Sequence, residues 1–255
     1  MAQTIEAPTM RASRLSDDAI FFYMAIVCAA VAFLGFAPTY WVPLLGGRLV
    51  AQPIIHLHAA IFFGWSVFLV YQAWLGATGR LRSHRRVGMI GVSLVTAMTM
   101  IGIGTAIHRM HWAAGIGQAE AGRAFAIVPV STVLYFALVF TAGVAVARHR
   151  DWHKRLMIVA GISILDAPIA RWFIVFLAPA QPAGPPPVAV DLGPAFVALL
   201  ILVIAMIADW RRSARVHSAY IYGALGYVAL KVLQVPFSET AAWHATATWL
   251  MRFGG

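Results

Sequence analysis

The chain has 255 residues, of which 61% are hydrophobic and only 11% are charged, so its composition lies far from that of a soluble domain. A water-soluble protein has too little polar surface to shield this many apolar side chains, which excludes a soluble enzyme, a secreted disulfide scaffold and a disordered chain. The single cysteine, Cys28, excludes an intrachain disulfide, a cysteine-based zinc site and an iron–sulfur cluster. The composition therefore predicts an all-α membrane protein that crosses the bilayer several times.

Seven stretches are long and apolar enough to span a bilayer, which requires about 20 residues. We place them at Ala19–Trp41, Ala51–Ala77, Val87–Met110, Ala124–Ala147, Arg155–Ala178, Pro194–Asp209 and Tyr220–Ala242. They predict one transmembrane domain over residues 19–242, between a cytoplasmic N-terminal tail (1–18) and a short outer C-terminal tail (243–255). Residues 179–194 contain six of the thirteen prolines and are expected to form an extended connector.

The positions of the arginines and lysines predict the orientation. Thirteen precede the first span or lie in the second, fourth and sixth loops, which share one side, whereas four lie on the opposite side. Because basic loops stay in the cytoplasm, we expect the N-terminus inside and the C-terminus outside, in the inner (plasma) membrane of a bacterium. The asymmetry also accounts for the net charge of +10 without nucleic acid as a partner.

Two similar segments indicate a possible internal repeat. His84–Gly88 opens the third span and His153–Met157 opens the fifth, each with a histidine followed by two basic residues. The second and third spans would then form one helix hairpin, and the fourth and fifth a second copy of it. The alternative is an independent origin, because basic residues suit any inner interface.

A His-x-His pair and two His-basic-basic motifs stand out in the chain. With their flanks they are His56-Leu57-His58 followed by Gln72, Ala77-Thr78-Gly79-Arg80, His84-Arg85-Arg86, Trp152-His153-Lys154-Arg155-Leu156-Met157, Ala170-Arg171-Trp172 and Thr240-Ala241-Ala242-Trp243. This set resembles an uncharacterised family of small polytopic inner-membrane proteins of bacteria, and it covers the second to fifth spans and the last one. The resemblance implies a multi-pass inner-membrane protein and supplies no activity.

Three charged residues lie well inside predicted spans, away from the span ends. Asp166 and Lys231 are expected near the bilayer centre, with Arg171 five residues beyond Asp166. A central charge costs about 2.5–3.5 kcal/mol on insertion scales, so such groups are candidates for a function. Asp166 and Lys231 either pair as a structural clip between the fifth and seventh spans or form the switch of a transporter or proton-coupled carrier. In the second case Arg171 would attract an anion.

Two spans carry a polar face that is expected to point into the bundle, because lipid cannot satisfy its hydrogen bonds. One face consists of Tyr220, Tyr227, Lys231, Gln234 and Ser238 on the seventh span, and the other of Ser93, Thr96, Gly104, His108 and His111 on the third. Each either lines a solvated cavity or joins helices through polar contacts.

Histidines gather toward the predicted outer side. They are His56, His58, His108, His111 and His244. If they converge, they form a site for haem or for a transition metal such as copper, zinc or iron, with His58, His108 and His111 as the preferred ligands. The alternative is that they are interfacial residues without a ligand.

These features lead to three functional hypotheses. The preferred one is a metal- or haem-binding membrane protein that acts in electron transfer or redox chemistry near the outer leaflet. The others are the transporter or proton-coupled carrier, and a non-catalytic subunit or assembly factor of a larger membrane complex. In each case the lipid bilayer is the expected environment.

Overall fold

The computed structural model describes residues 9–178 and 184–254, and no β-strand occurs in this part of the chain. The long helices are α1 (Thr9–Gly35), α3 (Pro53–Ala77), α4 (Leu81–Gly115), α6 (Ile127–Ala145), α7 (Arg150–Ser163), α9 (Leu192–Ser213) and α10 (Ser218–Phe237). The short ones are α2 (Val42–Leu45), α5 (Ala119–Phe125), α8 (Asp166–Trp172) and α11 (Ala241–Leu250), with π-helical turns η1 (Ala37–Trp41) and η2 (Phe173–Leu177) and 3₁₀ turns η3 (Val188–Asp191) and η4 (Met251–Phe253). The predicted all-α fold is confirmed.

Within the described residues, six helical segments are long and apolar enough to cross a membrane. They are Ala19–Leu45, Pro53–Ala77, Leu81–Gly115, Ala119–Ala145, Arg150–Leu177 and Val188–Ser213. A seventh span is formed only if α10 and α11, which are bent by 95° to each other, are taken together. The protein is a multi-pass membrane protein.

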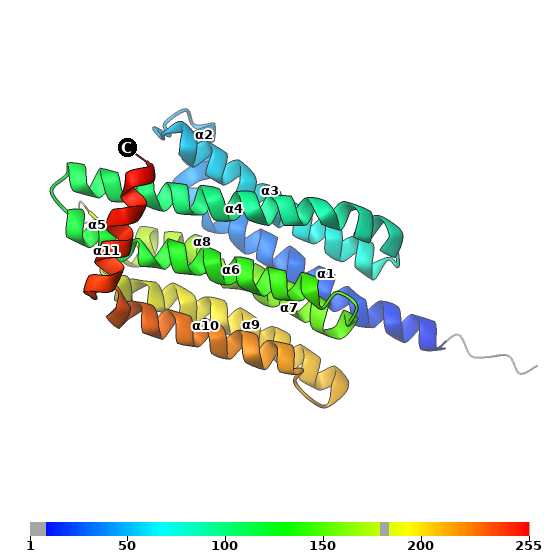
Figure 1. Ribbon diagram of the computed structural model, residues 1–255. Helices are drawn as coiled ribbons and strands as arrows, with labels where there is room; N and C mark the ends of the chain where they lie inside the picture. Colours follow the sequence, from blue (N-terminus) through cyan, green and yellow to red (C-terminus); the bar gives the residue numbers. More distant parts are fainter. Residues whose placement is uncertain (1–8, 179–183, 255) are drawn as a thin grey trace, which may run out of the picture.

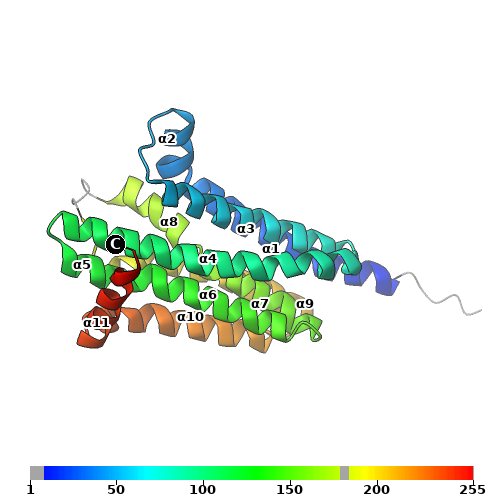
Figure 2. The same ribbon diagram turned by 45° about the horizontal axis from the view of Figure 1, so that its top comes forward.

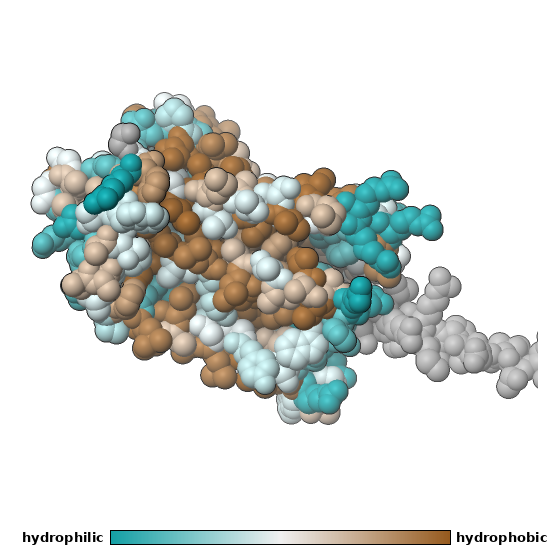
Figure 3. Space-filling model, in the orientation of Figure 1, coloured by the Kyte–Doolittle hydropathy of each residue, from teal (hydrophilic) through white to brown (hydrophobic). Residues whose placement is uncertain are grey.

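The long helices run side by side, and the loops fall into two groups at opposite ends of the bundle (Figure 1). One end, which we call the basic end, contains the connections α3–α4, α6–α7 and α9–α10, and α1 begins there. The other, which we call the α11 end, contains α2, α5 and α11. Apolar side chains cover the middle of the face seen in Figure 3, and hydrophilic ones lie toward the two ends. This distribution is typical of a protein whose middle is surrounded by lipid and whose ends contact water.

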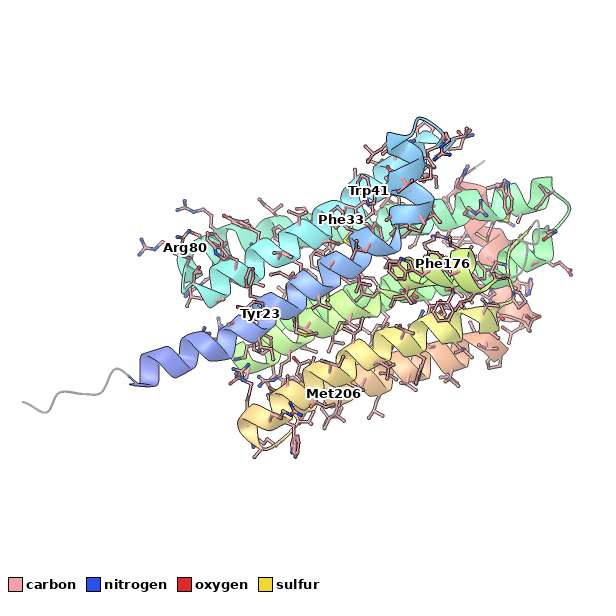
Figure 4. All side chains as sticks on the ribbon, turned by 180° about the vertical axis from the view of Figure 1, so that it is seen from behind. Tyr23, Phe33, Trp41, Arg80, Phe176 and Met206 are labelled. Atoms are coloured by element: carbon pink, nitrogen blue, oxygen red, sulfur yellow. The ribbon has the colours of Figure 1, made fainter. Side chains whose placement is uncertain are left out.

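The core lies where α1, α3, α4, α6, α7, α8, α9 and α10 meet. Trp65 of α3 is buried at its centre and makes edge contacts with the rings of Phe136 and Phe140. Helix α1 crosses the back of the bundle from Tyr23 toward Phe33, and Trp41 of η1 stacks on Phe33 (Figure 4). Helix α2 projects from the bundle at its α11 end (Figure 2). The bundle is therefore one packed unit.

The seventh helix ends earlier than predicted. Helix α10 stops at Phe237, one residue after Pro236, and the chain turns into α11. The hydroxyl of Thr240 accepts a hydrogen bond from the Trp243 N–H (3.2 Å) and caps the new helix. Residues 243–255, predicted as a tail, thus belong largely to α11 and η4. At the other terminus, α1 begins at Thr9, inside the predicted tail of residues 1–18.

The fifth span is interrupted in the middle. Helix α7 ends at Ser163 and α8 starts at Asp166. Pro168 explains the break, because it has no N–H for the carbonyl of Ile164 and its ring clashes with a continuing helix. The span therefore consists of two helices, with Asp166 at their junction.

The proline-rich connector is shorter than predicted. Residues 179–183 lie outside the described part, but 188–191 form the turn η3, and α9 begins at Leu192. The extended conformation is therefore a wrong prediction for residues 188–194, which are helical. As a result Asp191 enters the bundle.

One of the two predicted polar faces does not point inward. On α4, Ser93 and Thr96 are exposed. The hydroxyl of Thr96 donates to the carbonyl of Val92 in its own helix (2.9 Å), which satisfies it without a neighbour. A threonine can therefore face lipid at low cost.

The two predicted hairpins make matching contacts. His84 Nδ1 donates to the carbonyl of Gln72 (3.1 Å) in α3, and His153 Nδ1 donates to the carbonyl of Gly143 (2.9 Å) in α6. The two rings meet edge to face at 6.0 Å. An internal repeat would produce this arrangement, but the repeat itself stays a prediction.

Candidate functional site

The centre of the candidate site is Lys231, a buried lysine of α10. Its Nζ is the donor in three hydrogen bonds: to Asp166, to Asp191 Oδ2 at 2.8 Å and to Thr132 Oγ1 at 2.7 Å. Only 3% of Lys231 and 2% of Asp166 is exposed. The two charges predicted near the bilayer centre, Asp166 and Lys231, therefore meet, and a second aspartate joins them.

Each partner comes from a different element. Asp166 is the first residue of α8, immediately after the break in the fifth span. Asp191 is the last residue of η3, and Thr132 belongs to α6. The site thus joins four segments of the bundle that are far apart in the sequence.

A second set of polar groups surrounds the first. Gln234 Nε2 donates to Asp191 Oδ2 (2.9 Å), and the Ser131 hydroxyl donates to Gln234 Oε1 (3.2 Å). The hydroxyl of Tyr227, one turn before Lys231 on α10, is buried and has no hydrogen-bond partner among the described residues. Its ring centroid lies 5.7 Å from Lys231 Nζ. The cluster therefore contains one polar group without a partner.

The charges of this cluster do not cancel when all of its ionisable groups are charged. Two carboxylates, Asp166 and Asp191, share one ammonium group, and Thr132 and Gln234 are neutral. A buried charge without a partner costs several kcal/mol, so a group of this kind takes up a proton or a counter-ion. The site can therefore hold one proton in addition to that of Lys231.

The position of Lys231 within its helix differs from the prediction, while its depth in the membrane stays a prediction. Lys231 is six residues, or about 9 Å, from the last residue of α10. The prediction extended this helix to Ala242 and so placed Lys231 at its middle. The cluster lies closer to the α11 end of the bundle than to its basic end.

Sequence reasoning missed Asp191, because it assigned this residue to the extended connector. One signal was present: Asp191 directly precedes an apolar stretch with Pro194 in its first turn, a pattern typical of a helix start. Its burial, however, depends on the position of Lys231, which the local sequence does not contain.

Arg171 does not join the cluster. Its guanidinium lies over the ring of Phe36, 5.4 Å from the centroid. Within the described part of the chain, no carboxylate forms an ion pair with it. Helix α8 thus carries an acidic group at its start and a cation near its end.

The polar face of the seventh span is confirmed. Tyr220, Tyr227, Lys231, Gln234 and Ser238 are all buried. Ser238 donates to the carbonyl of Val235 (2.7 Å), whereas Lys231 and Gln234 reach other helices. This face connects helices and includes the charged cluster.

The predicted histidine ligands do not gather at one metal site in the described part of the chain. His58 Nδ1 is 3.4 Å from Thr105 Oγ1, His56 Nδ1 is 3.1 Å from the Tyr40 hydroxyl, and His111 Nε2 donates to the carbonyl of Met251 (3.0 Å). His108 and His244 are half-buried. In the part of the chain that the structure describes, no three histidine, cysteine or acidic side chains are placed to hold one metal ion. The predicted metal or haem site gains no support from this arrangement and stays a prediction.

No family model, no curated protein and no solved structure matches the chain. The resemblance to a bacterial inner-membrane family stays a prediction, and any functional assignment must come from the site itself.

Proposed function

We propose that this protein is a proton-coupled membrane carrier, in which Asp166, Asp191 and Lys231 form the site that binds and releases the coupling proton. The observation that supports this proposal best is the excess of one buried carboxylate over the single ammonium group. Ionisable groups inside membrane proteins are characteristic of proton pathways and ion sites.

The interruption of the fifth span also supports a carrier. Many transporters bind their ions and substrates where a membrane helix is broken, because the broken helix offers polar backbone groups and can move. Asp166 lies at such a break, and Arg171 follows on the same short helix. In this proposal, proton release from the cluster moves α8, and Arg171 attracts an anionic substrate. The burial of the cluster corresponds to an occluded state.

A purely structural ion pair would not need Asp191. Lys231 and Asp166 would form a neutral pair without it, whereas adding a second carboxylate to that pair costs free energy. Replacing Asp191 by asparagine keeps an acceptor for Lys231 and Gln234 and removes only the extra charge. We therefore expect Asp191→Asn to fold as stably as the wild type and to lose proton coupling.

The first test detects the proton directly. Infrared difference spectra between low and high pH report the C=O stretching band of a protonated carboxyl group. We expect a band in the wild type that disappears in Asp191→Asn or Asp166→Asn. It should remain in Glu239→Gln, a control that removes an exposed carboxylate from the same end of the bundle. If the band is unchanged in both aspartate variants, the cluster does not hold the proton.

The second test concerns transport. Proteoliposomes with an entrapped pH dye receive small solutes one class at a time, beginning with organic and inorganic anions. We expect a solute-dependent proton flux that falls at least about tenfold in Asp191→Asn, which corresponds to about 1.4 kcal/mol, and persists in Glu239→Gln. Equal fluxes in the two variants would contradict the proposal.

A further inference from the structure

An apolar groove of about 400 Å³ lies between α1 and α3. Two residues of α1 and four residues of α3 line it, and none of them carries a charge: Phe22, Ala29, Val67, Val70, Tyr71 and Trp74. The groove shares no residue with the Lys231 cluster. It is therefore a second feature of the molecule, with a chemistry opposite to that of the cluster.

The groove lies where α1 and α3 separate. Nearer the α11 end the two helices are in close contact, because the ring centroids of Phe33 and Phe63 are 4.7 Å apart. The groove starts about one helical turn from this contact, at Ala29 and Val67. From there the two helices diverge toward the basic end (Figure 4). Between Val67 and Trp74 the groove follows α3 for about 10 Å.

A cation lies at the basic end of the groove. The guanidinium group of Arg80 covers one of the lining residues, with Cζ at 4.5 Å from the centroid of the Trp74 ring. Arg80 is exposed at the end of α3 (Figure 4), and no described carboxylate forms an ion pair with it. The side chain can therefore bind an anion that comes from outside the protein.

Aromatic residues indicate that this end of the groove lies at the membrane surface. Tyr71 stacks on Trp74 with ring centroids 5.8 Å apart, and Tyr71 and Tyr23 are exposed. Exposed tyrosine and tryptophan residues are typical of the boundary between lipid and water. A lipid whose chain follows the groove would therefore have its headgroup at the level of Arg80.

We propose that the groove binds an acyl chain of one anionic phospholipid, whose phosphate group contacts Arg80. Charge complementarity selects this occupant, because the uncharged lining accepts the chain and the guanidinium group at its end matches phosphate oxygens. Lipid chains are as apolar as the groove, so the chain alone gains little over the bilayer. The headgroup therefore determines which lipid is preferred.

The headgroup contact is tested on the full chain in mild detergent, with phosphatidylglycerol or phosphatidylcholine of the same acyl chains as the added lipid. Native mass spectrometry reports the lipid molecules that stay bound. We expect the wild type to prefer phosphatidylglycerol, because the ammonium group of phosphatidylcholine offsets its phosphate charge. Arg80→Gln should weaken the binding of phosphatidylglycerol at least about fivefold, since it removes a charge-assisted hydrogen bond.

The matched control is Arg82→Gln, which removes the same charge from an exposed residue at the same end that does not line the groove. It should change the binding of phosphatidylglycerol less than about twofold, because a charge in water that makes no contact is screened. Equal effects of the two variants, or equal retention of the two lipids by the wild type, would overturn the proposal.

The position of the chain is tested by filling the groove. Ala29→Phe places a ring inside it and should reduce the binding of both lipids, whereas Ala30→Phe places the same ring on the neighbouring exposed residue and should not. Thermal unfolding shows whether both variants fold, and the exposed Arg80→Gln tests the proposal independently of them. Unchanged lipid binding by a folded Ala29→Phe would overturn the proposal. So would a wild-type dimer without bound lipid that Ala29→Phe dissociates, because a second copy would then occupy the groove.

Discussion

Asp191 directly precedes α9, where an aspartate normally accepts hydrogen bonds from the first N–H groups of the helix. Its side chain makes no such capping bond; it accepts from Lys231 and Gln234 instead. Another element thus holds the carboxylate more strongly than its own helix does. The carboxylate of Asp191 thereby adds a second negative charge to the interior of the bundle. This extra charge is the basis of the proposed proton site.

The backbone conformation of a single residue, Ala214, leads to a prediction about stability. Ala214 follows α9 and is the only residue other than glycine with a positive φ (55°) in the described part of the chain. Because a left-handed conformation costs an alanine about 1–2 kcal/mol, Ala214→Gly should raise the stability by about 1 kcal/mol. Thermal unfolding in detergent measures the change. Ala229→Gly, in the exposed middle of α10, should have the opposite sign, and two shifts of the same sign would show that φ is not the cause.

At the scale of the element, prolines explain two deviations from straight spans. Pro168 separates α7 from α8 and so places Asp166 at a helix start, and Pro236 precedes the bend into α11. The length of each apolar stretch predicted that a span exists there. It does not indicate where a helix is interrupted within that span. The proline positions were visible in the sequence, and they mark both irregular points.

The packing of α1 on α8 gives a prediction about elements. A Cβ added at Gly35 would lie 2.5 Å from Pro168 Cβ and 2.6 Å from its carbonyl oxygen, neither of which can yield without moving α8. Gly35→Ala should therefore lower the stability by about 1–3 kcal/mol. At Gly64 of α3 no atom lies within 4 Å, so Gly64→Ala should be neutral or stabilising by up to about 1 kcal/mol. Chemical unfolding of both variants measures the difference, and similar losses would contradict the tight α1–α8 contact.

At the scale of the whole molecule, the second, fourth and sixth loops of the predicted topology lie at one end of the bundle (Figure 1). They correspond to the connections α3–α4, α6–α7 and α9–α10. The alternation of the helices therefore agrees with the distribution of arginines and lysines along the sequence. The charge rule predicts the orientation, with the basic end in the cytoplasm.

The orientation can be tested with cysteine labelling, because the only cysteine, Cys28, is buried. In a Cys28→Ala background, Ser83→Cys places a thiol at the exposed basic end, and Thr248→Cys places one on the exposed side of α11. A membrane-impermeant maleimide added to intact cells should label the second thiol, and the first only after permeabilisation. The reverse pattern would show that the C-terminus is inside.

The sequence alone determined the class of protein, the approximate spans, the grouping of the basic loops and the buried polar face of α10. These follow from local properties, since apolar length and helical spacing are readable along a single segment. It also identified Asp166 and Lys231, because a charge inside an apolar stretch is conspicuous.

Only the tertiary structure decided which groups meet. It brought Asp191 and Thr132 to Lys231, left Arg171 over Phe36 and formed the apolar groove between α1 and α3. It also gathered no three of the described histidine, cysteine or acidic side chains at one metal site. The physical reason is that a buried charge is stabilised by partners from other helices. Their distance depends on how the helices pack, which no single segment of the sequence specifies.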